Sequence, residues 1–140
     1  LSYKYARLRE RGYKSVIHLR DLDYQAVEYA SDLSSGAGMA AMQNLLKDNP
    51  PDAVFAVSDT LAAGALRAIQ QAGLRVPEDI AVVGFDGTEL ADMISLTTIE
   101  QPSRDIGRKA VDLLLNKIDN PDAPTERVMM DWRFISRAST

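Results

Sequence analysis

Short apolar runs alternate with amphipathic segments along this chain. Runs rich in β-branched residues predict four strands, at Ala53–Val57, Ile80–Phe85, Leu96–Ile99 and Val128–Ile135. A weaker run at Val27–Ala30 predicts a fifth. The Ala53 and Ile80 runs are apolar at nearly every position, which is typical of strands covered by helices on both faces of a sheet.

Four other segments carry apolar residues three or four positions apart, which is the spacing of one helical face. These stripes are Tyr5, Leu8, Gly12 and Val16; Met39, Met42 and Leu46; Ala62, Ala65, Leu66 and Ile69; and Val111, Leu114, Leu115 and Ile118. Ser58 or Asp59 is suited to cap the start of the third helix, and Gly73 is suited to end it.

Strand, helix and strand therefore follow one another, and such units form parallel sheets with right-handed crossovers. The predicted fold class is α/β, with a mostly parallel, Rossmann-like sheet flanked by helices. With 140 residues, of which 46% are hydrophobic, the chain is long enough for one ordinary core. Because it begins at Leu1 rather than at a methionine, we expect it to be a fragment of a longer protein.

The amino-acid composition argues against several classes of function. The net charge is −4, and binding to nucleic acid phosphates needs a basic face, so this chain is not expected to bind DNA by itself. It has no cysteine and only one histidine, so we expect no metal site, no Ser-His-Asp triad and no cofactor. No run approaches the roughly 18 apolar residues of a membrane-spanning helix, and no signal peptide is visible.

Polar side chains follow the ends of four predicted strands. Because the carboxyl ends of parallel strands meet at one edge of the sheet, these groups are expected to gather there, where ligands bind in such folds. Carboxylates, amides and hydroxyls suit a polyhydroxylated or amide-bearing small molecule. The groups are Ser31, Asp32, Ser34 and Ser35; Ser58, Asp59 and Thr60; Asp86 and Thr88; and Glu100 and Gln101.

Each of these residues also has a purely structural interpretation. Asp59 is more typical of a helix cap than of a ligand contact, and Asp86-Gly87 is a common turn dipeptide. The segment from Gly36 to Ala41 fits the pattern G-x-G-x-x-A of dinucleotide-binding enzymes. Its preceding strand is weak and a polar loop stands where a tight turn is needed, so we keep it only as a minor alternative.

Motifs along nearly the whole chain resemble one known family. The strongest are VPEDIAVVGFDG at Val76–Gly87 and LTTIEQP at Leu96–Pro102. Shorter ones are Arg9-x-x-Gly12-Tyr13, Ala56-Val57-Ser58-Asp59 and the closing Phe134–Thr140. In this order they are similar to the motifs of the lactose-repressor/galactose-repressor family of transcription regulators.

The resemblance implies a larger parent protein. Members of the family carry a helix-turn-helix, a hinge and a periplasmic-binding-protein-like core whose two subdomains enclose the effector. Residues 1–140 would be the C-terminal subdomain, without the DNA-binding domain and the N-terminal subdomain. The resemblance thus implies a cytoplasmic regulator, active as a homodimer, that binds a sugar or small metabolite without catalysis. Operator DNA would be bound by the missing N-terminal domain.

The resemblance also implies a ligand-binding set of Arg9, Leu33, Ser58, Asp86 and Gln101. Arg9 matches an arginine that clamps the ligand, and the three polar residues match positions that bind it or support its pocket. Leu33 departs from the family, because many members have an aromatic residue there that stacks on a sugar or base. Its loss argues against a purine effector.

The sequence leaves open the exact dimer surface and the choice between related functions. The dimer surface is expected on the helix that starts at Asp59 and on Leu90–Ile94, although Met93 and Ile94 could equally belong to the core. A periplasmic sugar-binding transport protein of the same fold is the main alternative function, and a dinucleotide-binding enzyme is a weaker one.

Overall fold

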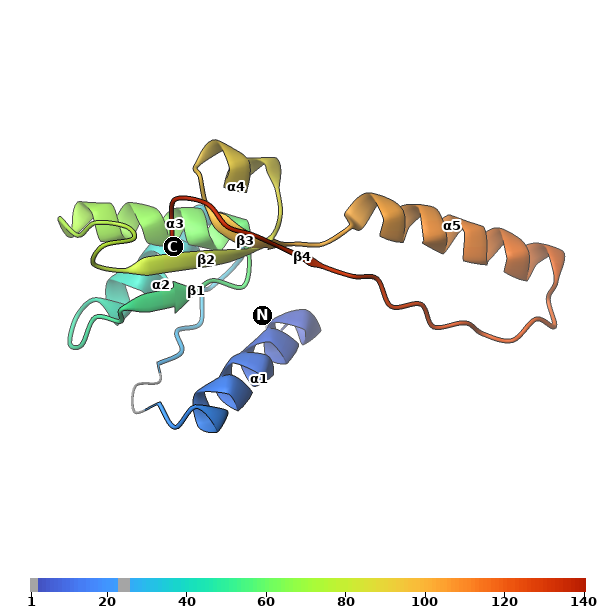
Figure 1. Cartoon of the computed structure of the whole chain (residues 1–140), viewed down its shortest axis with the longest axis horizontal. Coiled ribbons are helices and arrows are strands. Elements are labelled where there is room, and N and C mark those ends of the chain that lie inside the picture. The colour runs from blue at the N-terminus through green and yellow to red at the C-terminus, as the bar shows by residue number, and fades with distance from the viewer. Residues whose placement is uncertain (1–2, 23–25) are drawn as a thin grey trace.

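The structure is a computed structural model that describes residues 3–22 and 26–140. A four-stranded sheet lies at its centre (Figure 1). Its strands are β1 (Ala53–Phe55), β2 (Ala81–Asp86), β3 (Thr97–Glu100) and β4 (Arg133–Ile135), in that spatial order. The first three strands are parallel, and β4 is antiparallel to β3. This confirms the predicted α/β fold with a mostly parallel sheet.

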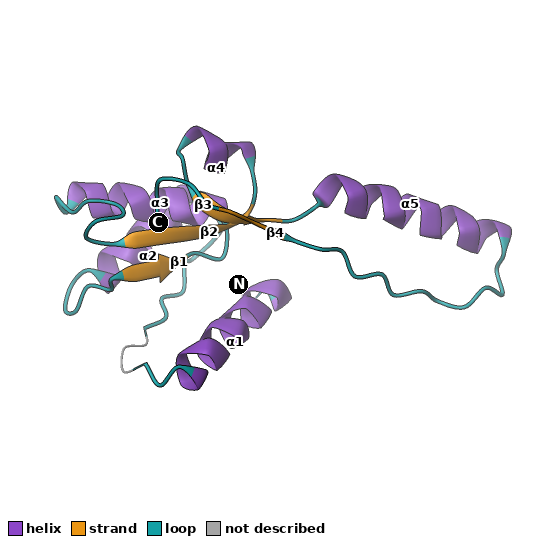
Figure 2. Ribbon diagram, viewed as in Figure 1, coloured by secondary structure: helices purple, strands orange, loops and turns teal. Residues whose placement is uncertain are grey.

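Five helices accompany the sheet in the described residues (Figure 2). They are α1 (Lys4–Leu19), α2 (Ser35–Leu45), α3 (Asp59–Gln71), α4 (Glu89–Met93) and α5 (Ser103–Asp119). Four of them coincide with the predicted amphipathic stripes. The short α4 was not predicted as a helix, because five residues do not display a helical period. No helix of the described residues has both the length and the apolarity needed to cross a membrane.

The core lies between the sheet and the pair α2 and α3. The apolar stripe of α3 is buried as predicted, since Ala62, Ala65 and Ile69 are at most 4% exposed. The other buried members of this core are Met42, Ala68, Ile80, Val82, Ala91 and Leu96. Small residues dominate the α3 contribution, so the helix lies close to β2.

Two glycines bring α2 and α3 together. A methyl group on Gly38 would collide with the backbone of Leu61, and one on Gly64 would collide with the backbone of Ser35 and Met39. Gly38 belongs to the G-x-G-x-x-A pattern, so close helix packing supplies a structural reason for that glycine.

The last residues of the chain lock β2 to β3. The Ser139 hydroxyl accepts a hydrogen bond from the Thr97 N–H at 2.8 Å and donates one to the Val82 carbonyl at 2.6 Å. The Arg137 guanidinium donates to the Leu96 carbonyl at 2.8 Å. Ser139 is 3% exposed, so its hydroxyl is a buried bridge between two strands.

Two strand predictions were wrong. Val27–Ala30 forms no strand, because the apolar cavity described below separates this segment from β1. Residues 128–132 form no strand either, and only Arg133–Ile135 of that run pairs with β3. In Figure 1 the chain from α5 to β4 runs alone, far from the sheet.

The helix α5 projects from the body and has no buried residue (Figure 2). Its predicted apolar stripe is exposed, with Val111 and Leu115 at 54%, Leu114 at 60% and Ile118 at 62%. The sequence therefore predicts the helix correctly, while in this structure nothing covers its apolar side.

We expect Gly64→Ala to lower the free energy of unfolding by about 1–3 kcal/mol, because the added methyl group must push α2 from α3. Gly12→Ala is the matched control. Nothing lies within 4 Å of the position its methyl group would take, and alanine is the better helix former, so it should be neutral or slightly stabilising. Urea unfolding of both variants measures the difference, and equal stability would contradict the close packing.

Candidate functional site

A cavity of about 420 Å³ opens at the carboxyl edge of the sheet. It is lined by Tyr5, Arg9, Leu33, Ser58, Thr60, Asp86 and Gln101. All five residues of the predicted ligand set thus lie around one cavity, although they come from α1, a loop and three strand ends. Their role in binding a ligand stays a prediction.

Arg9 joins α1 to the sheet. Its guanidinium donates to the Val57 carbonyl at 2.5 Å, lies 3.5 Å from the Asp86 carboxylate and stacks 3.5 Å from the centre of the Phe85 ring. The Tyr5 ring lies on the same group at 4.9 Å. Burial lowers the pKa of Arg9, while the Asp86 charge opposes that shift.

Asp86 ends β2 in a conformation that side chains rarely adopt. Its φ is +121°, and non-glycine residues held in such regions are characteristic of functional sites. Its carboxylate accepts a hydrogen bond from Gln101 Nε2 at 2.9 Å. Burial raises the pKa of Asp86, as does the nearby charge of Asp59, whereas Arg9 and Gln101 lower it.

Gly87 explains how this turn is possible. Its φ is +72°, and a side chain there would collide with Glu100 on the neighbouring strand.

Ser58 begins α3 as its N-cap. Its hydroxyl oxygen accepts a hydrogen bond from the Leu61 N–H at 3.2 Å, and the residue is 8% exposed. Its hydroxyl hydrogen is not used by that bond, so it is available to donate to a ligand. Of the two candidates for this cap, Ser58 is therefore the cap that the structure uses.

The interpretation of Asp59 as a cap was wrong. The residue is fully buried, and its carboxylate accepts hydrogen bonds from the backbone and hydroxyl of Thr88 and from the hydroxyl of Thr98. A long-range contact of this kind leaves no local spacing signal, so the sequence pattern alone could not reveal it.

Tyr5 lines the cavity and was missed, whereas Thr60, which also lines it, was among the polar residues expected at this edge of the sheet. Tyr5 lies four residues before Arg9, on the same face of α1, so its place beside a suspected ligand residue could have been inferred from helical spacing. The other polar residues after the weak strand serve structure: Ser34 caps α2, and Asp32 accepts from the Ser34 N–H at 2.7 Å.

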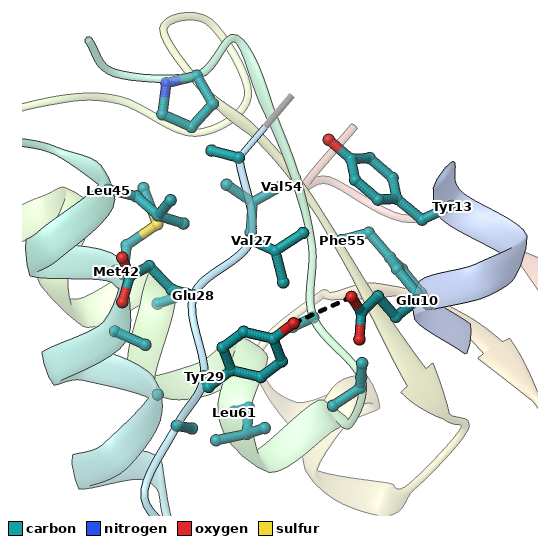
Figure 3. A pocket seen from close by; sticks show the side chains of 18 of the residues that line it. Glu10, Tyr13, Val27, Glu28, Tyr29, Met42, Leu45, Val54, Phe55 and Leu61 are labelled. Atoms are coloured by element: carbon teal, nitrogen blue, oxygen red, sulfur yellow. Dashed lines mark hydrogen bonds between the residues drawn. The ribbon is translucent and has the colours of Figure 1, made fainter. Parts of the chain in front are cut away.

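A second, larger cavity of about 1050 Å³ lies between α1, residues 26–33, α2 and β1 (Figure 3). Its lining is mainly apolar and includes Val27, Leu45 and Val54. The Tyr29 hydroxyl donates to Glu10 across its rim at 3.0 Å. It therefore has the character of an unfilled core rather than of a polar ligand site.

Among the described residues, no group of three or more acidic, His or Cys side chains is placed so that it could hold a metal ion.

We expect Arg9→Gln to raise the pKa of Asp86 further, because the variant removes a nearby positive charge while burial remains. A carbon-detected NMR titration of the carboxyl groups measures this shift. Asp79 is an internal control, because its pKa is lowered by its own partner Arg75 and should not move. An unchanged or lower pKa of Asp86 would contradict the ion pair.

The chain is similar in sequence and in fold to known proteins. Residues 2–140 match the family described as the periplasmic binding protein-like domain. The ribose operon repressor of Escherichia coli (strain K12) is 37% identical over 139 residues, which are 96% of this chain and 42% of that protein.

Two solved structures share the fold. One is a LacI family transcriptional regulator from Enterococcus faecium with bound ribose, at 32% identity and a TM-score of 0.86, covering 94% of this chain and 50% of that one. The other is the lac repressor dimer bound to operator and an anti-inducer, at 33% identity and a TM-score of 0.87, covering 97% and 48%. The chain spans half or less of the length of each of these three proteins.

Proposed function

Because this chain belongs to the periplasmic binding protein-like family, among the lactose-repressor type of regulators, we propose that it is the effector-binding part of a transcription regulator. The effector is a sugar or a small metabolite. The observation that carries this proposal is the convergence of Arg9, Ser58, Asp86 and Gln101 on one cavity at the carboxyl edge of the sheet.

The chemistry of these side chains suits a polyhydroxylated ligand. Arg9 offers a planar fork of donors, Asp86 offers an acceptor, and Ser58 and Gln101 can bind further hydroxyls. Hydrogen bonds to charged groups contribute about 1.5–3 kcal/mol each, so a few of them suffice for micromolar binding. This supports a sugar of the kind that gives the ribose operon repressor its name.

The apolar part of the cavity narrows the class of effector. Leu33 gives no aromatic surface, which disfavours a flat purine base. Among the described residues that line this cavity only Tyr5, beside Arg9, is aromatic, and the apolar face of a sugar ring can pack against its ring. We therefore favour a pentose or hexose over a nucleobase.

In this proposal the regulator works without breaking a bond. The effector binds more tightly in one relative orientation of two subdomains than in the other, and this difference shifts the affinity for operator DNA. The DNA is bound in the cytoplasm by a separate domain. The acidic chain described above contributes the effector site and one side of a homodimer.

The dimer contact is proposed on α3 and α4. Met93 in α4 is 77% exposed, so it is free to contact a partner, whereas Ile94 packs partly against the core. The lac repressor structure, which is described as a dimer, supports this assembly.

We further propose that residues 1–140 form the C-terminal half of the effector-binding core. The exposed apolar stripe of α5, together with Met129 at 78% and Trp132 at 64% exposure, would then be covered by the other half. The share of its relatives that the chain spans, half or less, supports this assignment.

The large cavity of Figure 3 fits the same proposal. On β1, Ala56 donates to the Val83 carbonyl of β2, so the backbone groups of Ala53 and Phe55 point the other way, into the cavity. In the described part of the chain they have no partner. A further strand of five or six residues occupies roughly 800–1,000 Å³ at the usual strand and layer spacings, and it would pair with both β1 and Val27–Ala30.

We expect Arg9→Ala and Asp86→Ala in the complete regulator each to weaken sugar binding about 10- to 150-fold and to abolish the effector response. Operator affinity without sugar should stay unchanged. Calorimetry with ribose, and then with a panel of other pentoses and hexoses, measures binding, and an operator-release assay measures the response.

The matched controls are Arg75→Ala and Asp79→Ala. They break a second Arg–Asp pair, which is more exposed and does not line the cavity, so they should leave sugar binding intact. A full effector response in both site variants would show that the cavity is not the effector site.

We expect the amide hydrogens of Ala53 and Phe55 to exchange slowly in the complete regulator and quickly in the isolated 140 residues, because only the complete protein would supply the added strand. Ala56 is the control, since its amide is bonded to β2 in both. Equal exchange of Ala53 and Phe55 in the two proteins, measured by NMR or mass spectrometry, would disprove the added strand.

A further inference from the structure

Asp59 is a buried carboxylate for which the proposed effector site has no direct use. It is 0% exposed and does not line the 420 Å³ cavity. Its Oδ2 accepts from the Thr88 N–H at 2.7 Å and from the Thr88 hydroxyl at 2.9 Å. Its Oδ1 accepts from the Thr98 hydroxyl at 2.6 Å.

These hydrogen bonds connect the ends of β1, β2 and β3, where the predicted ligand residues Ser58, Asp86 and Gln101 lie. Asp59 follows Ser58 at the start of α3, Thr88 lies two residues after Asp86, and Thr98 lies three residues before Gln101. One carboxylate therefore fixes the relative positions of all three strand ends.

The backbone of β2 packs closely against the Asp59 carboxylate. A methyl group on Gly84 of β2 would come within 2.5 Å of Asp59 Oδ1, so the strand passes directly over the carboxylate. The three donors satisfy the carboxylate, and its negative charge also acts on Arg9 and Asp86.

We propose that Asp59 is the positioning residue of the effector site: its carboxylate holds Ser58, Asp86 and Gln101 in register, and its charge adds to the field at the Arg9–Asp86 pair. This inference rests on the proposed function. It adds a residue outside the cavity whose charge, and not only its shape, governs effector binding.

The negative charge of Asp59 is expected to affect the pH dependence of sugar binding, through Asp86. The groups acting on Asp86 are Arg9 of α1, Asp59 of α3 and Gln101, while Glu100, its register partner on β3, is itself paired with Arg133. Since the Asp59 charge raises the pKa of Asp86, removing that charge lowers it. Sugar binding needs ionised Asp86, so its acidic midpoint should then move to lower pH.

The experiment measures sugar binding against pH in the complete regulator, with the pentose or hexose that binds most tightly in the panel above. Asp59→Asn keeps the shape and removes the charge. It should weaken binding about tenfold at neutral pH and shift the acidic midpoint to lower pH. Asp79→Asn, the same change at an exposed residue outside the site, should alter neither quantity.

Thr98→Val is the second variant and covers the case in which Asp59→Asn does not fold. It removes one donor and keeps the Asp59 charge, so binding should weaken about two- to tenfold while the midpoint stays. Weaker binding without a shift in Asp59→Asn would leave Asp59 a merely structural residue and overturn its electrostatic role. Wild-type affinity in Thr98→Val would overturn the positioning role.

The outcomes separate this inference from the function on which it rests. If the unmodified regulator binds no sugar of the panel, the proposed function and this inference both fail. If it binds sugar and Arg9→Ala weakens that binding as expected, while Asp59→Asn behaves like the unmodified protein, the function stands and the role of Asp59 is wrong.

Discussion

The ion pair of Arg9 and Asp86 is the contact on which the arrangement of this molecule depends. The helix α1 has no buried residue, and Arg9 is its main connection to the sheet, through the Val57 carbonyl, the Phe85 ring and Asp86. The same pair lines the proposed effector cavity. A ligand bound in this cavity would therefore contact the residue that also joins α1 to the sheet, which provides a physical link between binding and the position of this helix.

Such a pair costs stability, and the rest of the structure offsets that cost. A carboxyl group whose pKa is raised on folding opposes folding once it is ionised, and Asp86 also has a strained φ. The Asp59 hydrogen bonds hold the neighbouring strand ends, and the close contact of α2 with α3 and the Ser139 bridge stabilise the packed body that carries them. Asp86 is thus held in its strained conformation by a hydrogen-bonded and closely packed surrounding, as a preorganised binding site requires.

The parts that the sequence predicts well are those whose signal is local. The apolar periods of α3 and β2 correspond to buried faces, and strand ends gathered the polar residues because parallel strands share an edge. Asp59 was misread as a cap because its partners lie 29 and 39 residues away, beyond any spacing rule. Tyr5 was missed because a tyrosine in an amphipathic stripe is typical of a packing residue, and only its spacing of four residues from Arg9 indicates its place at the cavity.

The remaining discrepancies share one physical cause. Val27–Ala30 has the composition of a strand and faces an apolar cavity, and α5 has the period of a buried helix and lies exposed. A strand needs a neighbour for its hydrogen bonds, and an apolar stripe needs a surface to cover it. Both patterns are satisfied at once if the chain is half of a two-part core, as we propose. In that case the hydrophobic pattern describes the complete regulator more faithfully than the 140 residues show by themselves.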